Sequence, residues 1–436
     1  MAVCPIMGRT GKHPMKKMTV LALALASSTS LAHAAGNESV IGQIGAENSA
    51  VVGQLGGNNK QGTLQAGYKN SATTSQTAAG SNTNESGIGQ IGARNVAEVG
   101  QTGGNNRQGT LQVGVRNYAV TSQTGVATAG RLNTSGTAQF GYKNVSLVGQ
   151  TGGNNDQTTV QIGSRNRSVT GQETNKLGAT NGAGTLQIGS KNDATTSQVS
   201  SGTAKAAGPL SFLQADGKGG ENNATTVQIG RGNVAVTGQA SIGAPGLIGV
   251  GATRGVDNNA ATLQVGRENF ASTSQSGARP QVLPGTSNDS FIGQFGAGNV
   301  ALVGQTNGLN GQATVQVGSK NSAITTQSNV SAVTGLTQNA AATFQVGARN
   351  YANTTQVANP LSLGVNGSLV AQIGADNSAV VGQTGLQGMI GANLQQTIQV
   401  GAGNFASTSQ IGSSSVSNSS VTAQFGYKNV SVVSQK

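Results

Sequence analysis

The sequence contains few of the residues that build ordinary protein cores and reactive sites. Among its 436 residues there is no tryptophan, one cysteine, two histidines and 3% aromatic residues in all. Hydrophobic residues make up 35% of the chain, whereas globular domains are usually nearer half apolar. This shortage argues against a conventional enzyme of two or three packed domains. Charged residues are also scarce, at 9%, which argues against disorder driven by charge.

The first residues have the pattern of an export signal. Lys16 and Lys17 precede a short apolar run at 18–26, and an Ala-x-Ala motif ends at Ala34. A basic segment, an apolar segment and a small-residue motif in this order predict a signal peptide at 1–34, cleaved after the motif. The apolar run is too short to span a bilayer as a mature helix.

Cleavage removes every residue of the two types most used in catalysis and metal binding. Cys4, His13 and His33 all lie in the predicted leader, and the mature chain keeps 21 basic and 13 acidic residues. Without Cys or His there is no Ser-His-Asp or Cys-His arrangement, no His/Cys metal site and no disulfide. The acidic residues form no paired motif. We therefore expect no catalytic residue, no metal site and no cofactor, and conclude that the chain is not an enzyme.

What the chain does contain is glycine, 68 residues in all, and an internal repeat. The pattern N-x5-Q-x4-N-x5-Q begins with Asn37, Gln43, Asn48 and Gln54, and it recurs in fifteen units with all four polar positions filled. A glycine follows the first glutamine by two residues in every unit. Where no insertion intervenes, the period is 22 residues. Self-similarity at a fixed period is the signature of a repeat architecture.

The spacing within each half-unit predicts β-strands. Positions two apart share a character, as in Asn48, Ala50, Val52 and Gln54, and this is the period of a strand. The four residues between the first Gln and the second Asn, with their glycine, predict a tight turn in which Gly takes a positive φ or a close approach. We expect an all-β protein, a β-solenoid of about fifteen strand-turn-strand rungs with two stacked parallel sheets, over residues 35–436.

The connections between units vary in length, whereas the turn inside each unit does not. The long loops lie near 199–221, 240–257 and 276–287. Insertions confined to one edge are what a solenoid tolerates, because they leave the stacked rungs undisturbed. The alternative is that the long central loops separate two solenoid blocks.

Asn and Gln at fixed positions predict amide ladders along the stack. Rungs of a solenoid lie about 4.8 Å apart, and a side-chain amide carries both a donor and an acceptor. Each amide can therefore bond to its equivalents in the rungs on either side. The proposed ladder positions in the best-defined units are Asn37, Gln43, Asn48, Gln54, Asn59, Gln65, Asn70, Gln76, Asn84, Gln90, Asn95, Gln101, Asn106, Gln112, Asn117, Gln123, Asn155, Gln161, Asn166 and Gln172.

An apolar stripe is predicted on the outside of one sheet. The residue after the first Gln is apolar in unit after unit, as in Ile44, Ile91, Phe140 and Phe425, and its parity is opposite to that of the amides. Two interpretations stay open. The stripe packs locally against the turn, or it makes lateral contacts between stacks.

Neither end of the repeat array carries a recognisable cap. Soluble solenoids normally have polar capping segments, and exposed sheet edges are normally blunted. Each end should therefore accept another copy as one rung accepts the next. The expected product is an end-to-end homopolymer, a cross-β fibre.

The motif N-x5-Q-x-G-x2-N-x-[AS]-x3-Q resembles the curlin repeat of bacterial curli fibres, from Asn37 to Gln435 and interrupted only by loops. The resemblance implies secretion through an outer-membrane export pore and nucleated assembly into an extracellular functional amyloid at the bacterial cell surface. It also implies roles in adhesion and biofilm matrix. The chain departs from the family in its many units, its basic charge and the short segment between leader and repeats.

A column of basic residues is predicted on the edge formed by the fixed turns. The residue before the second Asn is basic in nine units: Lys69, Arg94, Arg116, Lys143, Arg165, Lys191, Lys320, Arg349 and Lys428. One interpretation is solubility and protection against lateral aggregation. The other is a linear polycation that binds anionic polymers or surfaces. No aromatic residues are interleaved in a way that supports specific nucleic-acid recognition.

Two other functional classes compete with a fibre subunit. A non-polymerising cell-surface adhesin could use the same repeats and bind a ligand through its long loops. An ice-binding solenoid would need a regular outward threonine face, but the parity of the threonines places them inside with the amides.

Overall fold

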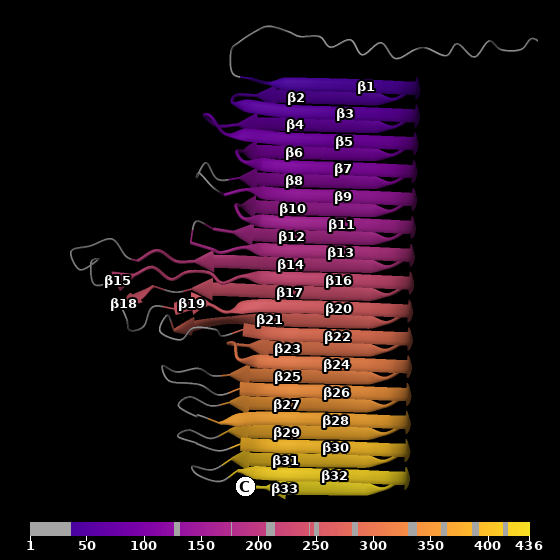
Figure 1. Ribbon diagram of the computed structural model, residues 1–436, viewed down its shortest axis with the longest axis vertical. Helices are drawn as coiled ribbons and strands as arrows, with labels where there is room; N and C mark the ends of the chain where they lie inside the picture. The colour runs from indigo at the N-terminus through magenta and orange to yellow at the C-terminus, as the bar shows by residue number, and fades with distance from the viewer. Residues whose placement is uncertain are drawn as a thin grey trace, which may run out of the picture. The chain divides into compact units, whose positions relative to one another are not determined.

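Each repeat unit folds into two β-strands joined by a tight turn (Figure 1). The computed structural model describes residues 36–125, 131–175, 177–205, 214–243, 245–247, 253–280, 287–329, 338–358, 364–385, 392–412 and 417–436. These residues belong to one compact unit, Ala35–Lys436. The predicted signal peptide at 1–34 lies outside the described residues.

The first strands of the units form one sheet and the second strands form another, which we call the first and second sheets. The first sheet contains β1 (Glu38–Ala46), β3 (Asn58–Tyr68), β5 (Thr83–Ala93), β7 (Asn106–Val115), β9 (Asn133–Tyr142), β11 (Asn155–Ser164), β13 (Asn181–Ser190), β16 (Asn222–Arg231), β20 (Asp257–Arg267), β22 (Ser287–Ala297), β24 (Asn310–Ser319), β26 (Gln338–Ala348), β28 (Val365–Ala375), β30 (Ala392–Ala402) and β32 (Asn418–Tyr427). The second contains β2 (Ser49–Leu55), β4 (Ser71–Ala78), β6 (Val96–Gly103), β8 (Tyr118–Gly125), β10 (Val145–Gly152), β12 (Arg167–Thr174), β14 (Asp193–Gly202), β17 (Val234–Gly243), β21 (Phe270–Pro280), β23 (Val300–Thr306), β25 (Ser322–Asn329), β27 (Tyr351–Ala358), β29 (Ser378–Gly385), β31 (Phe405–Gly412) and β33 (Val430–Gln435).

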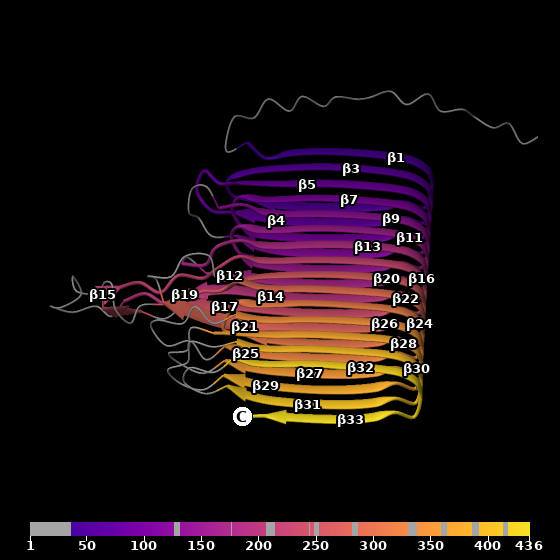
Figure 2. The same cartoon turned by 60° about the horizontal axis from the view of Figure 1, so that its bottom comes forward.

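Both sheets are parallel, and equivalent repeat positions pair with one another. Gln43 pairs with Gln65 in the first sheet, and Gln54 pairs with Gln76 in the second. The two sheets stack face to face and meet at the fixed turns (Figure 2). The prediction of an all-β solenoid with two parallel sheets is confirmed, and the described residues contain no helix.

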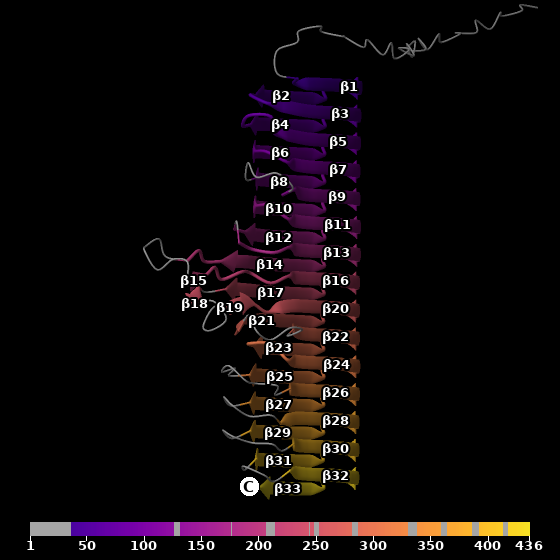
Figure 3. The ribbon, with the colours of Figure 1, turned by 60° about the vertical axis from the view of Figure 1, so that its left-hand side comes forward.

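The described parts of the long loops lie at the edge opposite the fixed turns (Figure 3). They carry β15 (Gln214–Ala215), which pairs antiparallel with β18 (Gly246–Leu247), and β19 (Thr253–Gly255), which pairs with the end of β21. Across these insertions β13 still pairs with β16, β16 with β20 and β20 with β22, and the second sheet continues in the same way. The alternative of two separate solenoid blocks is therefore wrong, because both sheets continue without a break.

The space between the sheets is narrow and largely polar. Inward positions of the second sheet hold Ala or Ser, then Val or Thr, then Gln. Larger aliphatic residues occur at a few rungs, where they form small clusters such as Ala72, Ile88, Ala97 and Val99. Because apolar burial is limited, hydrogen bonding must specify much of the interior.

The fixed turn uses two left-handed residues in every unit. The glycine two residues after the first Gln has φ between +109° and +129°, as predicted. The residue before the second Asn has φ between +54° and +67°, and it is glycine in only three units, at Gly232, Gly298 and Gly403. The predicted basic column therefore occupies a conformation that most side chains avoid, a feature that the sequence pattern did not reveal.

Candidate functional site

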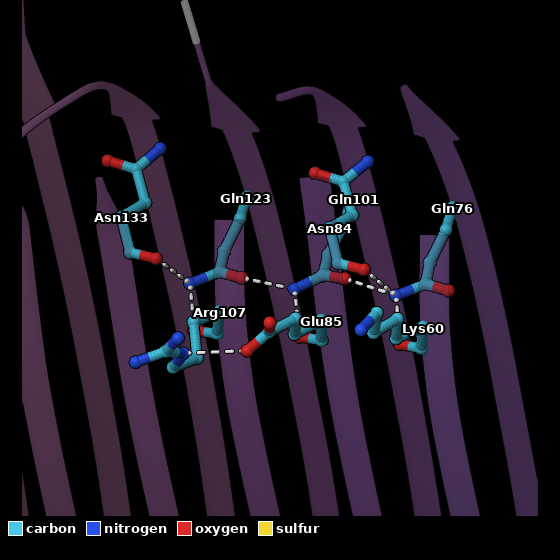
Figure 4. Close-up of polar contacts among 8 residues, drawn as sticks. All are labelled: Lys60, Gln76, Asn84, Glu85, Gln101, Arg107, Gln123 and Asn133. Atoms are coloured by element: carbon cyan, nitrogen blue, oxygen red, sulfur yellow. Dashed lines mark hydrogen bonds and ion pairs between the residues drawn. The ribbon is translucent and has the colours of Figure 1, made fainter. Parts of the chain in front are cut away.

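The two glutamine columns are continuous hydrogen-bonded ladders. Each Gln Nε2 donates to the Gln Oε1 of the following unit at 2.6–2.9 Å, from Gln43 to Gln424 in one column and from Gln54 to Gln435 in the other. Main-chain carbonyls fix the orientation: Gln101 Nε2 also donates to the carbonyl of Glu85 at 2.9 Å (Figure 4). A carbonyl can only accept, so the amide nitrogen must face it.

The asparagine columns run in the opposite direction. Asn59 Nδ2 donates to Asn37 Oδ1 of the preceding unit at 3.0 Å, and the same bond is repeated to Asn418. In the second Asn column the main-chain N–H also donates to the preceding Oδ1, as from Asn70 to Asn48 at 3.0 Å. A main-chain N–H can only donate, so it fixes the amide oxygen on its side.

The opposed columns make the two ends of the stack complementary. At the N-terminal end the outermost Gln43 and Gln54 present side-chain oxygens that accept no hydrogen bond from the described residues, Asn37 presents its side-chain amide and Asn48 its main-chain N–H. The side-chain amide of Asn48 is already bonded to the carbonyls of Ile44 and Gly67. At the C-terminal end the pattern is reversed, because glutamines donate and asparagines accept along that direction. The sequence placed the amides in columns but carried no indication of their polarity.

Interior and terminal amides differ in burial. Sixteen of the predicted ladder residues are buried: Asn59, Gln65, Asn70, Gln76, Asn84, Gln90, Asn95, Gln101, Asn106, Gln112, Asn117, Gln123, Asn155, Gln161, Asn166 and Gln172. The four in the first unit are not: Asn37 and Gln43 are exposed, and Asn48 and Gln54 are half-buried. In the last unit Asn418 and Gln424 are still buried, whereas Asn429 and Gln435 are half-buried, so the amides of the first unit are the ones with the least cover.

A fifth, discontinuous polar column was not foreseen. Four residues before the first Gln, five units have a Gln, each preceded in the stack by a Ser whose hydroxyl donates to it at 2.9–3.1 Å. Each of these glutamines donates to the Thr two residues later, as Gln312 does to Thr314. The alternation of a short and a long polar side chain is visible in the sequence, but its partners lie in the neighbouring rung.

Seven buried threonine hydroxyls in the second sheet have no hydrogen-bond partner within the described residues: those of Thr74, Thr121, Thr170, Thr273, Thr325, Thr354 and Thr408. Valine occupies the equivalent inward position in other units, for example Val303 and Val381. An unsatisfied buried hydroxyl costs stability. The interior is therefore not optimised at this column.

Both sheets have unpaired edges at the terminal rungs. Among the described residues β1 pairs only with β3 and β33 only with β31. Ile41 of β1 is 46% exposed, whereas Ile88 and Ile292, at the same inward position in the middle of the stack, are 3% and 0% exposed. One further rung would bury this side chain, and β-strand edges readily pair with another strand.

The nine basic residues do lie in one column on the fixed-turn edge, but acidic residues and glycines share it. Glu47 precedes Lys69 in this column, and their charged atoms are 3.0 Å apart. Arg349 and Asp376 approach to 2.6 Å. The hydrogen bond from Arg349 lowers the pKa of the Asp376 carboxyl. The longest uninterrupted basic run covers six consecutive units from Lys69 to Lys191.

Tyrosines lie beside three of these cations. The ammonium groups of Lys69, Lys143 and Lys428 are 4.8–5.1 Å from the ring centres of the preceding tyrosines. Hydrogen bonding with Lys143, and secondarily with Arg116, lowers the pKa of Tyr142. The Tyr-Lys dipeptides are readable in the sequence, so this contact could have been found.

The predicted outer stripe is on the outside of the first sheet. Ile44, Ile91, Ile162, Phe295 and Phe425 are exposed, and Val113, Phe140, Ile188 and Val265 are half-buried. Their outward orientation follows from the buried glutamine next to each of them.

Within the described part of the chain there is no cluster of three or more metal-ligating side chains. The same residues include no helix long and apolar enough to cross a membrane. No family model and no curated protein matches this chain.

Proposed function

We propose that the mature chain is a structural subunit of an extracellular fibre that grows by end-to-end addition of copies. The observation that carries this proposal is the complementarity of the two terminal rungs. Gln424 and Gln435 would donate to Gln43 and Gln54 of the next copy. The side-chain amide of its Asn37 and the main-chain N–H of its Asn48 would donate back, as the equivalent groups do at every internal junction.

Charges at the two ends support the same joint. The first rung carries Glu38 and Glu47, and the last carries Lys428 and Lys436. In the turn column, Lys428 would pair with Glu47 of the next copy as Arg349 pairs with Asp376 of the next rung, at 2.6 Å. Head-to-tail joining therefore pairs opposite charges.

The resemblance to the curlin repeat supports the setting of this fibre. We place it outside a bacterial cell, after removal of a signal peptide and passage through an outer-membrane pore, with a nucleator that starts growth. Adhesion and biofilm matrix are the roles that we propose.

Assembly of purified residues 35–436 tests this function. We expect filaments that bind thioflavin and diffract at about 4.8 Å along their axis. Glu47→Lys should slow elongation, because a lysine there faces Lys428 of the preceding copy, and adding Lys428→Glu should restore it. Asp376→Lys, at the same column position inside the stack, is the matched control and should elongate normally.

Stable monomers that neither elongate nor bind thioflavin would overturn the proposal. They would favour the alternative of a non-polymerising surface adhesin built on the same repeats. Equal slowing by the two lysine substitutions would show that the effect is not at the joint.

We propose anionic polymers as ligands of the basic turn column. Six consecutive rungs bring cations to a spacing of about 4.8 Å, and counterion release then favours polyanion binding. The triple variant Arg94→Gln, Arg116→Gln and Lys143→Gln should weaken binding of heparin or polyphosphate to the filaments. Binding should also weaken strongly at about 0.5 M salt, where the Debye length of about 4 Å is shorter than this spacing. Binding that is not weakened by this salt would refute the electrostatic mechanism.

A further inference from the structure

On the outer surface of the first sheet, one half of each strand is recessed and the other half carries side chains that project further from the sheet. We define the groove columns as the residues five and three positions before the first Gln of each unit. The ridge columns are the residues one before and one after it. In β26 the groove residues are Ala340 and Ala342, and the ridge residues are Phe344 and Val346. All four alternate with buried residues and face outward.

The ridge columns contain no polar side chain. Across the fifteen units, all thirty ridge positions hold Ala, Val, Leu, Ile, Phe or Gly. Leu64, Leu111 and Phe344 are 40–50% exposed. A continuous apolar band of this length on one face is unusual for a surface that only meets water.

The groove is a real depression. Between β24 and β32 it has a volume of about 700 Å³ and is lined by small residues such as Gly311, Ala313, Ala342 and Gly367. Another stretch of about 380 Å³ runs over Gly87, Gly109 and Gly136. At the N-terminal rungs a stretch of about 410 Å³ has charged residues along one side, among them Lys60, Glu85 and Arg107. All three stretches lie on the outer face of the first sheet.

Several of the groove glycines have no neighbour in this chain that requires glycine, whereas Gly182 and Gly367 are covered by side chains of the next rung at 2.9 Å. A Cβ added to Gly62, Gly87 or Gly109 would meet no atom within 4 Å, and none of the three has a positive φ. By contrast, Gly42 and Gly89 in the ridge are covered by leucine side chains of the next rung, which lie 3.2 and 3.3 Å from where a Cβ would be. Glycine weakens a strand, and these glycines leave open space above the groove. Open glycines also occur on the outer face of the second sheet, as at Gly100 and Gly171, so the argument for the first sheet depends on its apolar ridge beside the groove.

We call the column three residues before the first Gln the inner groove column and the column one residue before it the inner ridge column. In most rungs where these two side chains differ in size, one is small and the other is large. The groove residue is smaller in six rungs, Gly62/Leu64, Gly109/Leu111, Gly184/Leu186, Ala261/Leu263, Ala313/Val315 and Ala342/Phe344, and the order is reversed in four, Val40/Gly42, Phe291/Gly293, Leu369/Ala371 and Val421/Ala423. The other five rungs have residues of similar size or Gln396. In the four reversed rungs the small and the large side chain exchange places together. A partner surface that fits each rung must therefore carry the same pair of side chains at the same level of the stack.

We propose that this face binds a second copy of the chain, related by a two-fold axis parallel to the stack. The axis passes between the inner groove and inner ridge columns. Rotation about it keeps each rung at its own level and places the ridge of one copy in the groove of the other. The residues five before the first Gln, charged in six units, then lie at the rim of the interface. Ala342 then faces Phe344 of the second copy, and Phe344 faces its Ala342. The interface is isologous, as in most homodimers.

The area suffices for a stable pair. Seven positions along a strand span about 23 Å, and with rungs about 4.8 Å apart each rung contributes roughly 110 Å² per copy. About eight rungs reach the roughly 800 Å² per partner of a standard interface. The two copies also point the same way along the stack, so pairing is compatible with end-to-end growth and does not depend on it.

Charge complementation tests the pairing and its register. Ala313→Glu and Val315→Lys each place a charge at the centre of the interface, next to the two-fold axis and opposite an apolar residue, so each variant alone should give mostly single-width particles. In a mixture of the two, Glu at 313 faces Lys at 315 of the other copy, and we expect paired particles to increase at least about fivefold over either variant alone, which corresponds to roughly 1 kcal/mol. Ile324→Lys, outward on the second sheet, is the matched control and should pair as wild type.

The readout is mass per length of filaments by scanning transmission microscopy, and molecular mass of soluble protein by sedimentation. Wild-type filaments should have two chains per rung level, and soluble wild-type protein should sediment as a dimer. Single-width wild-type filaments would overturn the pairing while leaving end-to-end assembly intact. Dimers without filaments would support the pairing and refute the fibre. Failure of the mixture to restore pairs would exclude the proposed register.

Discussion

Replacing a turn glycine should open the stack at one rung. Gly163 has φ +119°, and a Cβ there would lie 2.0 Å from the carbonyl oxygen of Gly189 in the next rung. An L-residue at this φ costs about 1–3 kcal/mol. Relieving the clash requires the rungs to separate by about 1 Å, which weakens about two hydrogen bonds at roughly 1 kcal/mol each. We therefore expect Gly163→Ala to destabilise this rung by about 3–5 kcal/mol.

Hydrogen exchange of the mature protein, followed by mass spectrometry, measures this local effect. Peptides from β11 and β13 should exchange about 10²–10³ times faster, because each 1.4 kcal/mol is a factor of ten. Gly171→Ala in β12 is the matched control. A Cβ there meets no atom within 4 Å. Removing a strand glycine should therefore leave the free energy of local opening unchanged or raise it by up to about 1 kcal/mol, which slows exchange. Exchange within about threefold of wild type in Gly163→Ala, or equal effects of both substitutions, would refute the reasoning.

The interior and the turn edge allow three further tests. Thr325→Val should stabilise the chain by about 1 kcal/mol by removing an unpaired hydroxyl, whereas Thr314→Val should destabilise it by about 1–2 kcal/mol, because Thr314 accepts a hydrogen bond; thermal unfolding measures both. Gln161→Leu removes the 2.8 Å hydrogen bonds that join Gln161 to the glutamines of the preceding and following rungs. It should lower the free energy of local opening, measured by hydrogen exchange, by about 2–4 kcal/mol. Arg349→Gln should return the pKa of Asp376 from its lowered value towards its ordinary one. Since the pKa of Asp376 is lower in the folded chain than in the unfolded one, the pair contributes its full stabilisation above the unfolded pKa. This stabilisation is lost as the pH falls through the folded pKa. NMR titration of the carboxyl group measures the change in pKa.

The arrangement within one rung could be read from the sequence because it is local and periodic. Alternation at period two assigns Asn48, Val52 and Gln54 to one face, and the invariant four-residue spacing places the turn. A shift by one residue would turn every amide outward, so only one in-plane register buries them. Fifteen repetitions of the same pattern then predict two parallel sheets with loops at one edge.

Several features could not be predicted because they depend on neighbours far away in the sequence. The left-handed conformation of Lys143 is imposed by the geometry of the turn, although lysine has no preference for it. The pairing of Ser135 with Gln157 joins residues in adjacent rungs. The open space above Gly109 exists only because no side chain of this chain covers it.

Spacing along the chain was enough to establish which residues face inward, where each strand turns and how many rungs the stack has. Only the folded stack establishes that glutamine and asparagine columns donate in opposite directions and that groove and ridge alternate on the outer face. The physical reason is that an amide can be turned either way until a main-chain carbonyl or N–H from another strand fixes it. In the same way, the height of a surface is set by the side chains that stacking brings about 4.8 Å above and below.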